Sequence, residues 1–172
     1  LELKMRTVFN LLGPLTNPAG ASAQLVGAPS PEAASLMAEA LAALGLARGF
    51  VVHGSDGLDE ITTTGPTLAF EIRKGEVTRL TLAPEDFGVN RTSRETLLGG
   101  DRAANCEIAR AVLGGASGPR RDIVLVNASA ALVAAGQARD FRQGMALAAL
   151  SIDCGAALAK AQELARFTQQ FV

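Results

Sequence analysis

The stretch Gly49-Phe-Val-Val-His-Gly-Ser-Asp-Gly-Leu-Asp-Glu60 joins an apolar run to a cluster of acidic residues. The run from Gly49 to His53 is continuous and is followed by turn residues, a pattern typical of a strand that is buried on both faces of a parallel sheet. The polar residues after it would then lie beyond the carboxyl end of the strand, where open parallel sheets usually bind their ligands. This stretch therefore predicts the class of the fold and the place of its chemistry.

The segments on either side of this strand alternate between extended and helical patterns. Residues 24–28 are a strand candidate. The helix predicted over 31–44 begins after Ser30, a typical N-cap residue, with a proline and a glutamate in its first turn. Residues 67–73 and 76–82 contain β-branched and apolar side chains and flank a Lys-Gly turn, which predicts an antiparallel hairpin.

The rest of the chain is mainly helical in pattern, with one further strand. Asp101 opens a helix that is predicted to run to about residue 113. Residues 123–126, Ile-Val-Leu-Val, predict a second buried strand, which leads into an Ala-rich helix over 129–135, and a final helical region covers 140–171. Strands that alternate with helices predict an α/β fold. We expect a mainly parallel sheet with an antiparallel hairpin, flanked by helices.

Composition argues against several classes of protein. The chain has 172 residues, of which 48% are hydrophobic and 19% charged, so we expect one packed domain rather than disorder. Its 16 basic and 17 acidic side chains give a net charge of −1, which supplies no general attraction for nucleic acid or an anionic membrane. Cys106 and Cys154 lack the spacing of a zinc site or a disulfide framework, which favours a reduced, cytosolic setting.

The acidic cluster is the strongest candidate for chemistry. Asp56, Asp59 and Glu60 place three carboxylates within five residues. Gly54 and Gly57 allow the backbone to turn tightly enough for these carboxylates to converge. Hard oxygen ligands suit Mg²⁺, which proteins commonly hold through one or two carboxylates while water and substrate phosphate complete the shell. An acidic, solvated turn would explain the same residues without a metal, so spacing alone leaves both interpretations open.

Other routes to chemistry find less support. His53, the only histidine, is either an acid–base group or a strand-end side chain that is hydrogen-bonded to a neighbouring loop. Ser55 lacks the Gly-x-Ser-x-Gly context of a hydrolase nucleophile. Glycine-rich loops of the kind that bind dinucleotides or nucleoside triphosphates do not occur in the sequence. Residues 99–101, Gly-Gly-Asp, could point backbone amides at an anion, although a helix start capped by Asp101 explains them as well.

Longer motifs resemble one enzyme family. Arg6-Thr-Val-Phe-Asn-Leu-Leu-Gly-Pro-Leu-Thr-Asn-Pro18, which predicts a short helix followed by an ordered loop, resembles the signature segment of the anthranilate phosphoribosyltransferases. Residues 53–60 are similar to the acidic metal loop of that family, and residues 99–105 and 124–128 follow in the family's order. The resemblance covers essentially the whole chain.

This resemblance implies a fold and a division into domains. Enzymes of the family pack a small helical domain on a larger α/β domain of the nucleoside phosphorylase and phosphoribosyltransferase type. By the resemblance, residues 1–172 form a single α/β domain that supplies most of the larger one. The N-terminal helical domain and the first part of the α/β domain would be missing.

The resemblance also implies a reaction of tryptophan biosynthesis, in which the phosphoribosyl group of phosphoribosyl pyrophosphate passes to the amine of anthranilate and pyrophosphate is released. It assigns Asp59 and Glu60 as the residues that bind Mg²⁺ at the pyrophosphate, and it assigns no catalytic residue in this chain. The family's Gly-Thr-Gly-Gly-Asp and Lys-His-Gly-Asn-Arg segments, which hold phosphoribosyl pyrophosphate, do not occur here. We therefore expect the chain alone to be inactive, and the complete cytoplasmic enzyme to be a homodimer joined mainly through its helical domain.

Two other functions stay open. Pyrimidine nucleoside phosphorylases share the broad architecture and also act at C1 of a ribose, but they use inorganic phosphate and would not be expected to carry the acidic pair. A non-catalytic paralogue that binds nucleic acid would need a basic surface, which a net charge of −1 does not favour.

Overall fold

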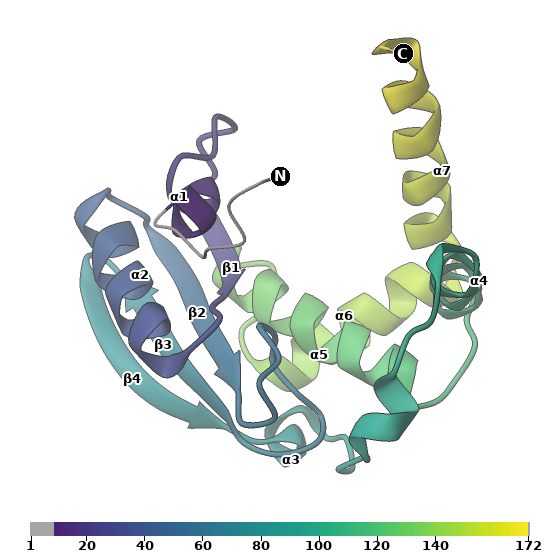
Figure 1. The fold of residues 1–172 in the computed structure, drawn as a ribbon, viewed down its shortest axis with the longest axis horizontal. Helices are drawn as coiled ribbons and strands as arrows, with labels where there is room; N and C mark the ends of the chain where they lie inside the picture. The colour runs from purple at the N-terminus through teal and green to yellow at the C-terminus, as the bar shows by residue number, and fades with distance from the viewer. Residues whose placement is uncertain (1–8, 172) are drawn as a thin grey trace, which may run out of the picture.

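The computed structural model describes residues 9–171, with side chains from residue 12 onward, so the first three residues of the motif at 6–18 lie outside the described range. Figure 1 shows a curved sheet with helices packed against it and a C-terminal helix that extends away from the other elements. In chain order the elements are α1 (Phe9–Leu15), β1 (Ala23–Gly27), α2 (Pro31–Ala43), β2 (Arg48–Gly54), β3 (Thr67–Arg73), β4 (Glu76–Leu82), α3 (Pro84–Phe87), the short 3-10 helix η1 (Arg94–Leu97), α4 (Arg102–Leu113), α5 (Pro119–Ala134), α6 (Phe141–Asp153), α7 (Ala156–Thr168) and the 3-10 helix η2 (Gln169–Phe171).

The described strands form one mixed sheet in the order β1-β2-β3-β4. β1 and β2 run parallel, whereas β2 pairs with β3, and β3 with β4, in antiparallel fashion. The strands predicted at 24–28 and 49–53 are confirmed. The hairpin predicted from 67–73 and 76–82 is confirmed with the same bounds. The chain therefore has the predicted α/β class.

The strand predicted at 123–126 is wrong, because these residues lie inside α5, one continuous helix. A run of four apolar residues does not distinguish a buried strand from a buried helix segment. The buried residues of α5 recur at helical spacing through both segments, the predicted strand at 123–126 and the predicted helix at 129–135. They are Leu125, Val126, Ser129, Ala130, Val133 and Ala134. Without a strand here, the described sheet has one parallel pair and is mixed rather than mainly parallel.

Two predicted helix starts are confirmed by their caps. Ser30 Oγ accepts a hydrogen bond from the Ala33 N–H at 3.2 Å, at the start of α2. Asp101 Oδ1 accepts one from the Ala104 N–H at 2.9 Å, at the start of α4. Each cap satisfies a backbone donor that the helix itself leaves free. The side chain of Asp101 thus occupies the helix start that residues 99–101 could otherwise offer to an anion.

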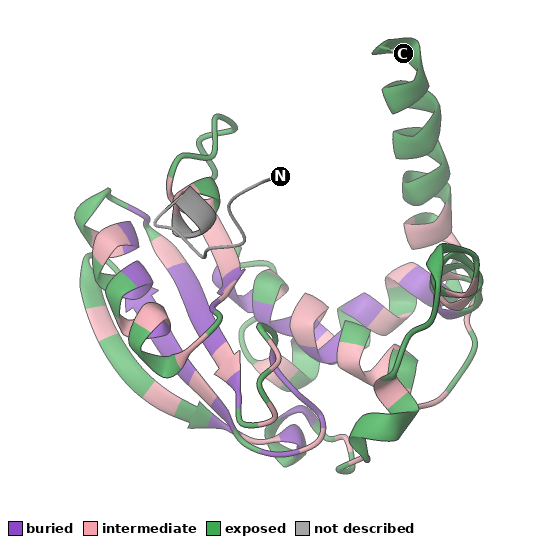
Figure 2. Ribbon diagram, viewed as in Figure 1, coloured by how far each residue is buried: buried purple, intermediate pink, exposed green. Residues whose placement is uncertain are grey.

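Both faces of the sheet are covered by helices. Along β2, Val51 belongs to the apolar cluster beneath α2, whereas Phe50 and Val52 belong to the cluster beneath α5. Figure 2 shows the buried residues along the strands and on the sides of α2 and α5 that face them. β2 is therefore buried on both faces, as its continuous apolar sequence predicts.

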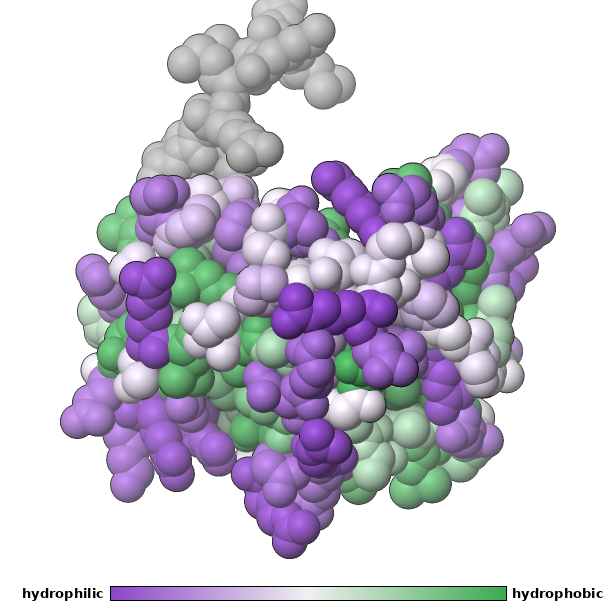
Figure 3. Space-filling view, turned by 90° about the horizontal axis from the view of Figure 1, so that it is seen from below, coloured by the Kyte–Doolittle hydropathy of each residue, from purple (hydrophilic) through white to green (hydrophobic). Residues whose placement is uncertain are grey.

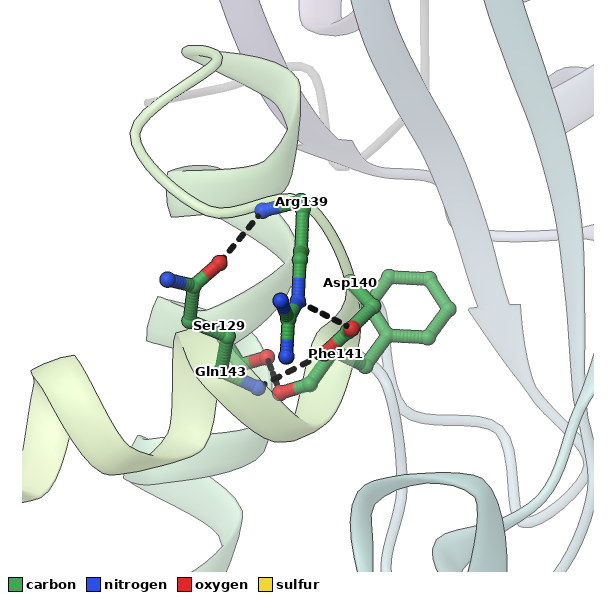
Figure 4. A network of polar contacts seen from close by, with 5 residues as sticks. All are labelled: Ser129, Arg139, Asp140, Phe141 and Gln143. Carbon is green, nitrogen blue, oxygen red and sulfur yellow. Dashed lines mark hydrogen bonds and ion pairs between the residues drawn. The ribbon is translucent and has the colours of Figure 1, made fainter.

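A polar network fixes the joint between α5 and α6 (Figure 4). Ser129 Oγ of α5 donates to Phe141 O at 2.6 Å. Asp140 caps α6 by accepting from the Gln143 N–H at 2.8 Å, and Gln143 Oε1 in turn accepts from the Arg139 N–H at 2.9 Å. The bond from Ser129 joins α5 to the first turn of α6, and the other two bonds fix that first turn.

α7 leaves the body of the molecule after Gly155, whose φ of 79° breaks the helical path. None of the residues of α7 is buried, and Figure 2 shows almost its whole length as exposed. Within residues 9–171 no single helix is long and apolar enough to cross a membrane. Only α6 taken together with residues 156–171 reaches the necessary length and composition, and that pair is bent by 65°.

Candidate metal centre

The acidic loop, residues 55–66, connects β2 to β3 and folds back on the end of β2. The Gly54 N–H donates to Leu58 O at 2.8 Å, and the Gly57 N–H donates to Gly54 O at 2.9 Å. Gly57 has a φ of 88°, a conformation that glycine adopts without strain. The start of the loop is therefore a defined turn, as its glycines predict.

Asp56 is a structural group of this loop. Its carboxylate accepts hydrogen bonds from the hydroxyls of Thr62 at 2.6 Å and Thr64 at 2.8 Å, and from the Leu58 N–H at 3.2 Å. Burial pushes the pKa of Asp56 upward, but these hydrogen bonds outweigh burial and leave the pKa below its usual value. Within residues 9–171 no three acidic, histidine or cysteine side chains group as metal ligands. The expected convergence of all three carboxylates is therefore wrong, because Asp56 is engaged inside the loop.

Asp56→Asn is expected to lower the free energy of unfolding by about 1.5–3 kcal/mol at neutral pH, because hydrogen bonds to a charged acceptor are lost. The pKa of Asp56 is depressed in the folded protein, so its contribution is present above the unfolded-state pKa and is lost as the pH falls through the folded-state pKa. Denaturant unfolding at neutral and acidic pH measures both effects. Glu39→Gln, at an exposed carboxylate of α2, is the control and should stay within about 0.5 kcal/mol of the parent. A deficit for Asp56→Asn that is equally large in acid would contradict this role.

Asp59 and Glu60 lie at the carboxyl ends of the parallel pair β1 and β2. A cavity of about 350 Å³ is lined here by the two strand ends, the acidic loop and α5, and its lining includes Gly27, Asp59, Glu60 and Asn127. The end of β1 approaches the loop closely, since a side-chain carbon at Gly27 would lie 2.6 Å from the carbonyl carbon of Asp59. The two carboxylates thus lie at the edge of the sheet where parallel strands usually bind ligands.

Solvent reaches both Asp59 and Glu60, although the cavity wall covers part of Glu60. The ion pairs in the described part of the chain all involve other acidic side chains. Partial burial beside the cavity, together with the negative charge of Asp59, raises the pKa of Glu60. Two neighbouring negative charges therefore repel each other at the mouth of a cavity. A bound cation would relieve that repulsion.

This donor set fits Mg²⁺. Proteins commonly bind Mg²⁺ through one or two carboxylates, and substrate phosphate and water complete its six ligands. Asp59 and Glu60 offer hard oxygen ligands on one side, and the cavity leaves space on the other. A cage made of protein alone would need further ligands, and residues 9–171 contain no such group of three. The pair therefore fits a metal that is shared with a phosphate-bearing substrate.

A side chain of α5 holds the backbone next to the pair. Asn127 Oδ1 accepts from the Ile61 N–H, and Asn127 Nδ2 donates to Ile61 O, both at 2.9 Å. Asn127 Nδ2 also donates to Ile123 O at 3.0 Å within the helix. Spacing in the sequence does not reveal this contact, because 66 residues separate the partners. The only signal is an amide side chain inside an apolar run.

His53 has a structural contact. Its Nδ1 lies 2.9 Å from Ala28 O, just beyond the end of β1. A ring nitrogen that faces a carbonyl oxygen at this distance carries the proton, so Nδ1 is the donor. Of the two interpretations of His53, the geometry agrees with a strand-end side chain that is bonded to a neighbouring loop.

A second, larger hollow adjoins the pair. This apolar groove has a volume of about 640 Å³ and is lined by η1, α4, α5 and the acidic loop. It shares Glu60, Ile123 and Val124 with the smaller cavity. Arg120 at the start of α5 donates to Leu98 O at 2.7 Å, which joins α5 to the segment before α4. Glu60 therefore borders two hollows, one between the strand ends and α5 and one between the helices.

Comparison with known proteins finds relatives over nearly the whole chain. A family model described as the glycosyl transferase family, a/b domain, matches residues 1–158. The anthranilate phosphoribosyltransferase of Solibacter usitatus (strain Ellin6076) is 70% identical over 167 residues, which are 97% of this chain and 49% of the relative. The anthranilate phosphoribosyltransferase of Moorella thermoacetica is 51% identical over 170 residues, 99% of this chain and 50% of the relative. The chain spans about half the length of the curated relatives it matches.

Solved structures share the fold. The anthranilate phosphoribosyltransferase of Thermus thermophilus matches with a TM-score of 0.87 at 44% identity, over 98% of this chain and 50% of that one. The Saccharomyces cerevisiae enzyme in complex with PRPP and Mg matches with a TM-score of 0.80 at 28% identity, over 90% of this chain and 45% of that one. The resemblance inferred from the motifs is therefore confirmed.

Proposed function

The chain belongs to the glycosyl transferase family, a/b domain, and we propose that it is the part of an anthranilate phosphoribosyltransferase that carries the metal-binding carboxylates. High identity to enzymes of that name over nearly the whole chain supports the proposal. Because the chain spans about half the length of these relatives, the proposed activity is that of a protein with the relatives' full length.

In the proposed reaction, the bond between ribose C1 and pyrophosphate breaks, and its electron pair leaves with pyrophosphate. A bond from C1 to the amine nitrogen of anthranilate forms, and that nitrogen gives up one proton to water or to the departing pyrophosphate. Asp59 and Glu60 would hold Mg²⁺ at the ends of β1 and β2. Bound there, Mg²⁺ supplies positive charge to a leaving group that is otherwise strongly anionic. No strong base is required in this chain, because the sugar carbon becomes cationic and positioning of the reactants lowers much of the barrier.

The observation that carries the proposal is the adjacent pair of carboxylates beside a cavity at the carboxyl ends of a parallel strand pair. Carboxylates repel a phosphate unless a cation lies between them. The pair therefore suits a complex of metal and pyrophosphate better than the bare inorganic phosphate that a nucleoside phosphorylase uses.

The proposal extends to the partners and surroundings of the enzyme. The proposed substrates are phosphoribosyl pyrophosphate and anthranilate, as supported by yeast structures in complex with PRPP or with 4-fluoroanthranilate. We propose a cytoplasmic homodimer that is joined through a helical domain, in which residues 1–172 form one α/β domain. Nucleic acid is not among the proposed partners. The net charge is −1, and Figure 3 shows hydrophobic residues set among hydrophilic ones on one face of the molecule.

The proposal can be tested in a full-length chimera, in which residues 1–172 replace the matching segment of the Solibacter usitatus relative. At 70% identity the two segments should pack alike against the rest of that enzyme. We expect the chimera to consume anthranilate in the presence of phosphoribosyl pyrophosphate and Mg²⁺, and the 172-residue chain alone to consume none, because a metal pair without the remaining substrate contacts cannot position the reactants. The fluorescence of anthranilate reports its consumption. Phosphate-dependent cleavage of pyrimidine nucleosides by the chimera, without transfer to anthranilate, would contradict the proposal.

A further inference from the structure

We propose that Asn127 of α5 is a positioning residue for the metal-binding pair, because it fixes the backbone of Ile61 and thereby sets where Asp59 and Glu60 lie. The inference rests on the proposed function, since it concerns the same site. The side chain of Asn127 lines the same cavity as both carboxylates.

The contact between Asn127 and Ile61 restrains two backbone groups at once. The amide oxygen accepts the Ile61 N–H and the amide nitrogen donates to Ile61 O, each at 2.9 Å. The same nitrogen donates to Ile123 O at 3.0 Å, so both of its hydrogens are used. With its donors engaged, the Asn127 side chain is itself held in one orientation. It therefore holds the residue that follows Glu60 at a fixed distance from α5.

The surroundings make this contact rigid. The side chain of Ile61 is 1% exposed and packs in the cluster beneath α5, which also contains Val126 and Ala130. A displacement of the Ile61 backbone would therefore disturb a packed interior. Residues that orient metal ligands in this indirect way typically change metal affinity by about 10- to 100-fold when they are altered.

The other restraints on the acidic loop act elsewhere. Asp56 bonds to Thr62 and Thr64 within the loop itself. The Thr92 N–H donates to Thr63 O from the segment before η1. Among the polar contacts of the described residues, Asn127 supplies the link from α5 to the loop, and this link is made at the residue next to Glu60. A change at Asn127 should thus move the pair without unfolding the turn around Asp56.

The test measures how strongly Mg²⁺ improves binding of pyrophosphate to the full-length chimera, by calorimetric titration with and without Mg²⁺. We expect Asn127→Ala to reduce the factor by which Mg²⁺ raises the affinity for pyrophosphate by about tenfold or more. The matched control is Ser129→Ala, which removes another buried polar contact of the same helix, on the side that faces α6. We expect Ser129→Ala to lower the melting temperature by a similar amount and to leave the effect of Mg²⁺ on pyrophosphate affinity within about twofold of the parent, because the Ser129 hydroxyl bonds to the start of α6 and not to the backbone of Ile61. Equal effects of the two variants on Mg²⁺-dependent binding would overturn the proposal.

A second variant covers the case in which Asn127→Ala does not fold. Asn127→Gln keeps the amide but places it one methylene further from α5, so it should weaken the effect of Mg²⁺ several-fold. Retention of the full effect by Asn127→Gln would overturn the proposal.

Asp59→Asn and Glu60→Gln distinguish a failure of the positioning role of Asn127 from a failure of the proposed metal-binding pair. If these variants abolish the effect of Mg²⁺ and Asn127→Ala does not, positioning by Asn127 fails alone. If they leave the effect unchanged, the proposed metal pair itself fails.

Discussion

Asp59→Asn and Glu60→Gln are each expected to lower kcat of the full-length chimera by roughly 30- to 900-fold, which corresponds to about 2–4 kcal/mol of barrier. Both changes keep the size of the side chain and remove its charge. In the proposed function, that charge holds the ion against a leaving group whose negative charge grows as the bond to C1 breaks. The lost interaction would therefore be stronger in the transition state than in the bound substrate, so kcat falls rather than the affinity for anthranilate.

Part of this deficit should be recovered when the concentration of Mg²⁺ is raised, because weakened affinity is offset by mass action. Steady-state rates over a range of Mg²⁺ concentrations measure both effects. Asp56→Asn is unsuitable as the charge control, since its carboxylate holds the loop together. Glu39→Gln, on the exposed side of α2, is the better control. Near-normal turnover of the Asp59 and Glu60 variants at limiting Mg²⁺ would leave an acidic, solvated turn as the explanation of these residues.

Gly27→Ala is expected to lower the free energy of unfolding by about 3 kcal/mol and to weaken Mg²⁺-dependent binding of pyrophosphate as well. The added carbon would overlap the carbonyl oxygen of Asp59 and lie 2.6 Å from its carbonyl carbon, so either the end of β1 or the acidic loop must move. Neither can move freely, because β1 is paired with β2 and the loop is anchored to α5. Thermal unfolding and calorimetric titration of the chimera measure the two effects.

Gly13→Ala is the matched control for that substitution. Gly13 lies in α1, and a side-chain carbon there meets no atom of the described part of the chain within 4 Å. Alanine in an open helical position is neutral or stabilises by up to about 1 kcal/mol. A Gly27→Ala protein as stable as Gly13→Ala would mean that β1 does not press on the loop, and the proposed placement of Asp59 would lose its support.

Local patterns in the sequence predict much of this fold. The strand at 49–53 is recognisable because it is uniformly apolar and is followed by turn residues, and the hairpin at 67–82 because a Lys-Gly turn separates two β-rich runs. Ser30 and Asp101 mark their helices because capping is a local interaction. In each case the residues that decide the structure lie within a few positions of one another.

The wrong predictions concern segments whose structure depends on residues that are distant in the sequence. The apolar run at 123–126 has the same local pattern in a strand and in a buried helix, and it is packing against the sheet that selects the helix. The three carboxylates of the acidic cluster also differ in ways that their spacing does not reveal. Asp56 turns inward because Thr62 and Thr64 provide hydroxyl donors, whereas Asp59 and Glu60 remain beside the cavity. The link from Asn127 to Ile61 spans 66 residues, and the amide of Asn127 within an apolar run does not indicate its partner.

The most direct test of the metal-binding pair is the binding of pyrophosphate to the chimera that carries both Asp59→Asn and Glu60→Gln, measured by calorimetric titration with and without Mg²⁺. If the two carboxylates hold the ion, Mg²⁺ should strengthen binding to the parent by at least about tenfold more than to the double variant. Mg²⁺ that strengthens pyrophosphate binding equally in the parent and the double variant would contradict the assignment of Asp59 and Glu60.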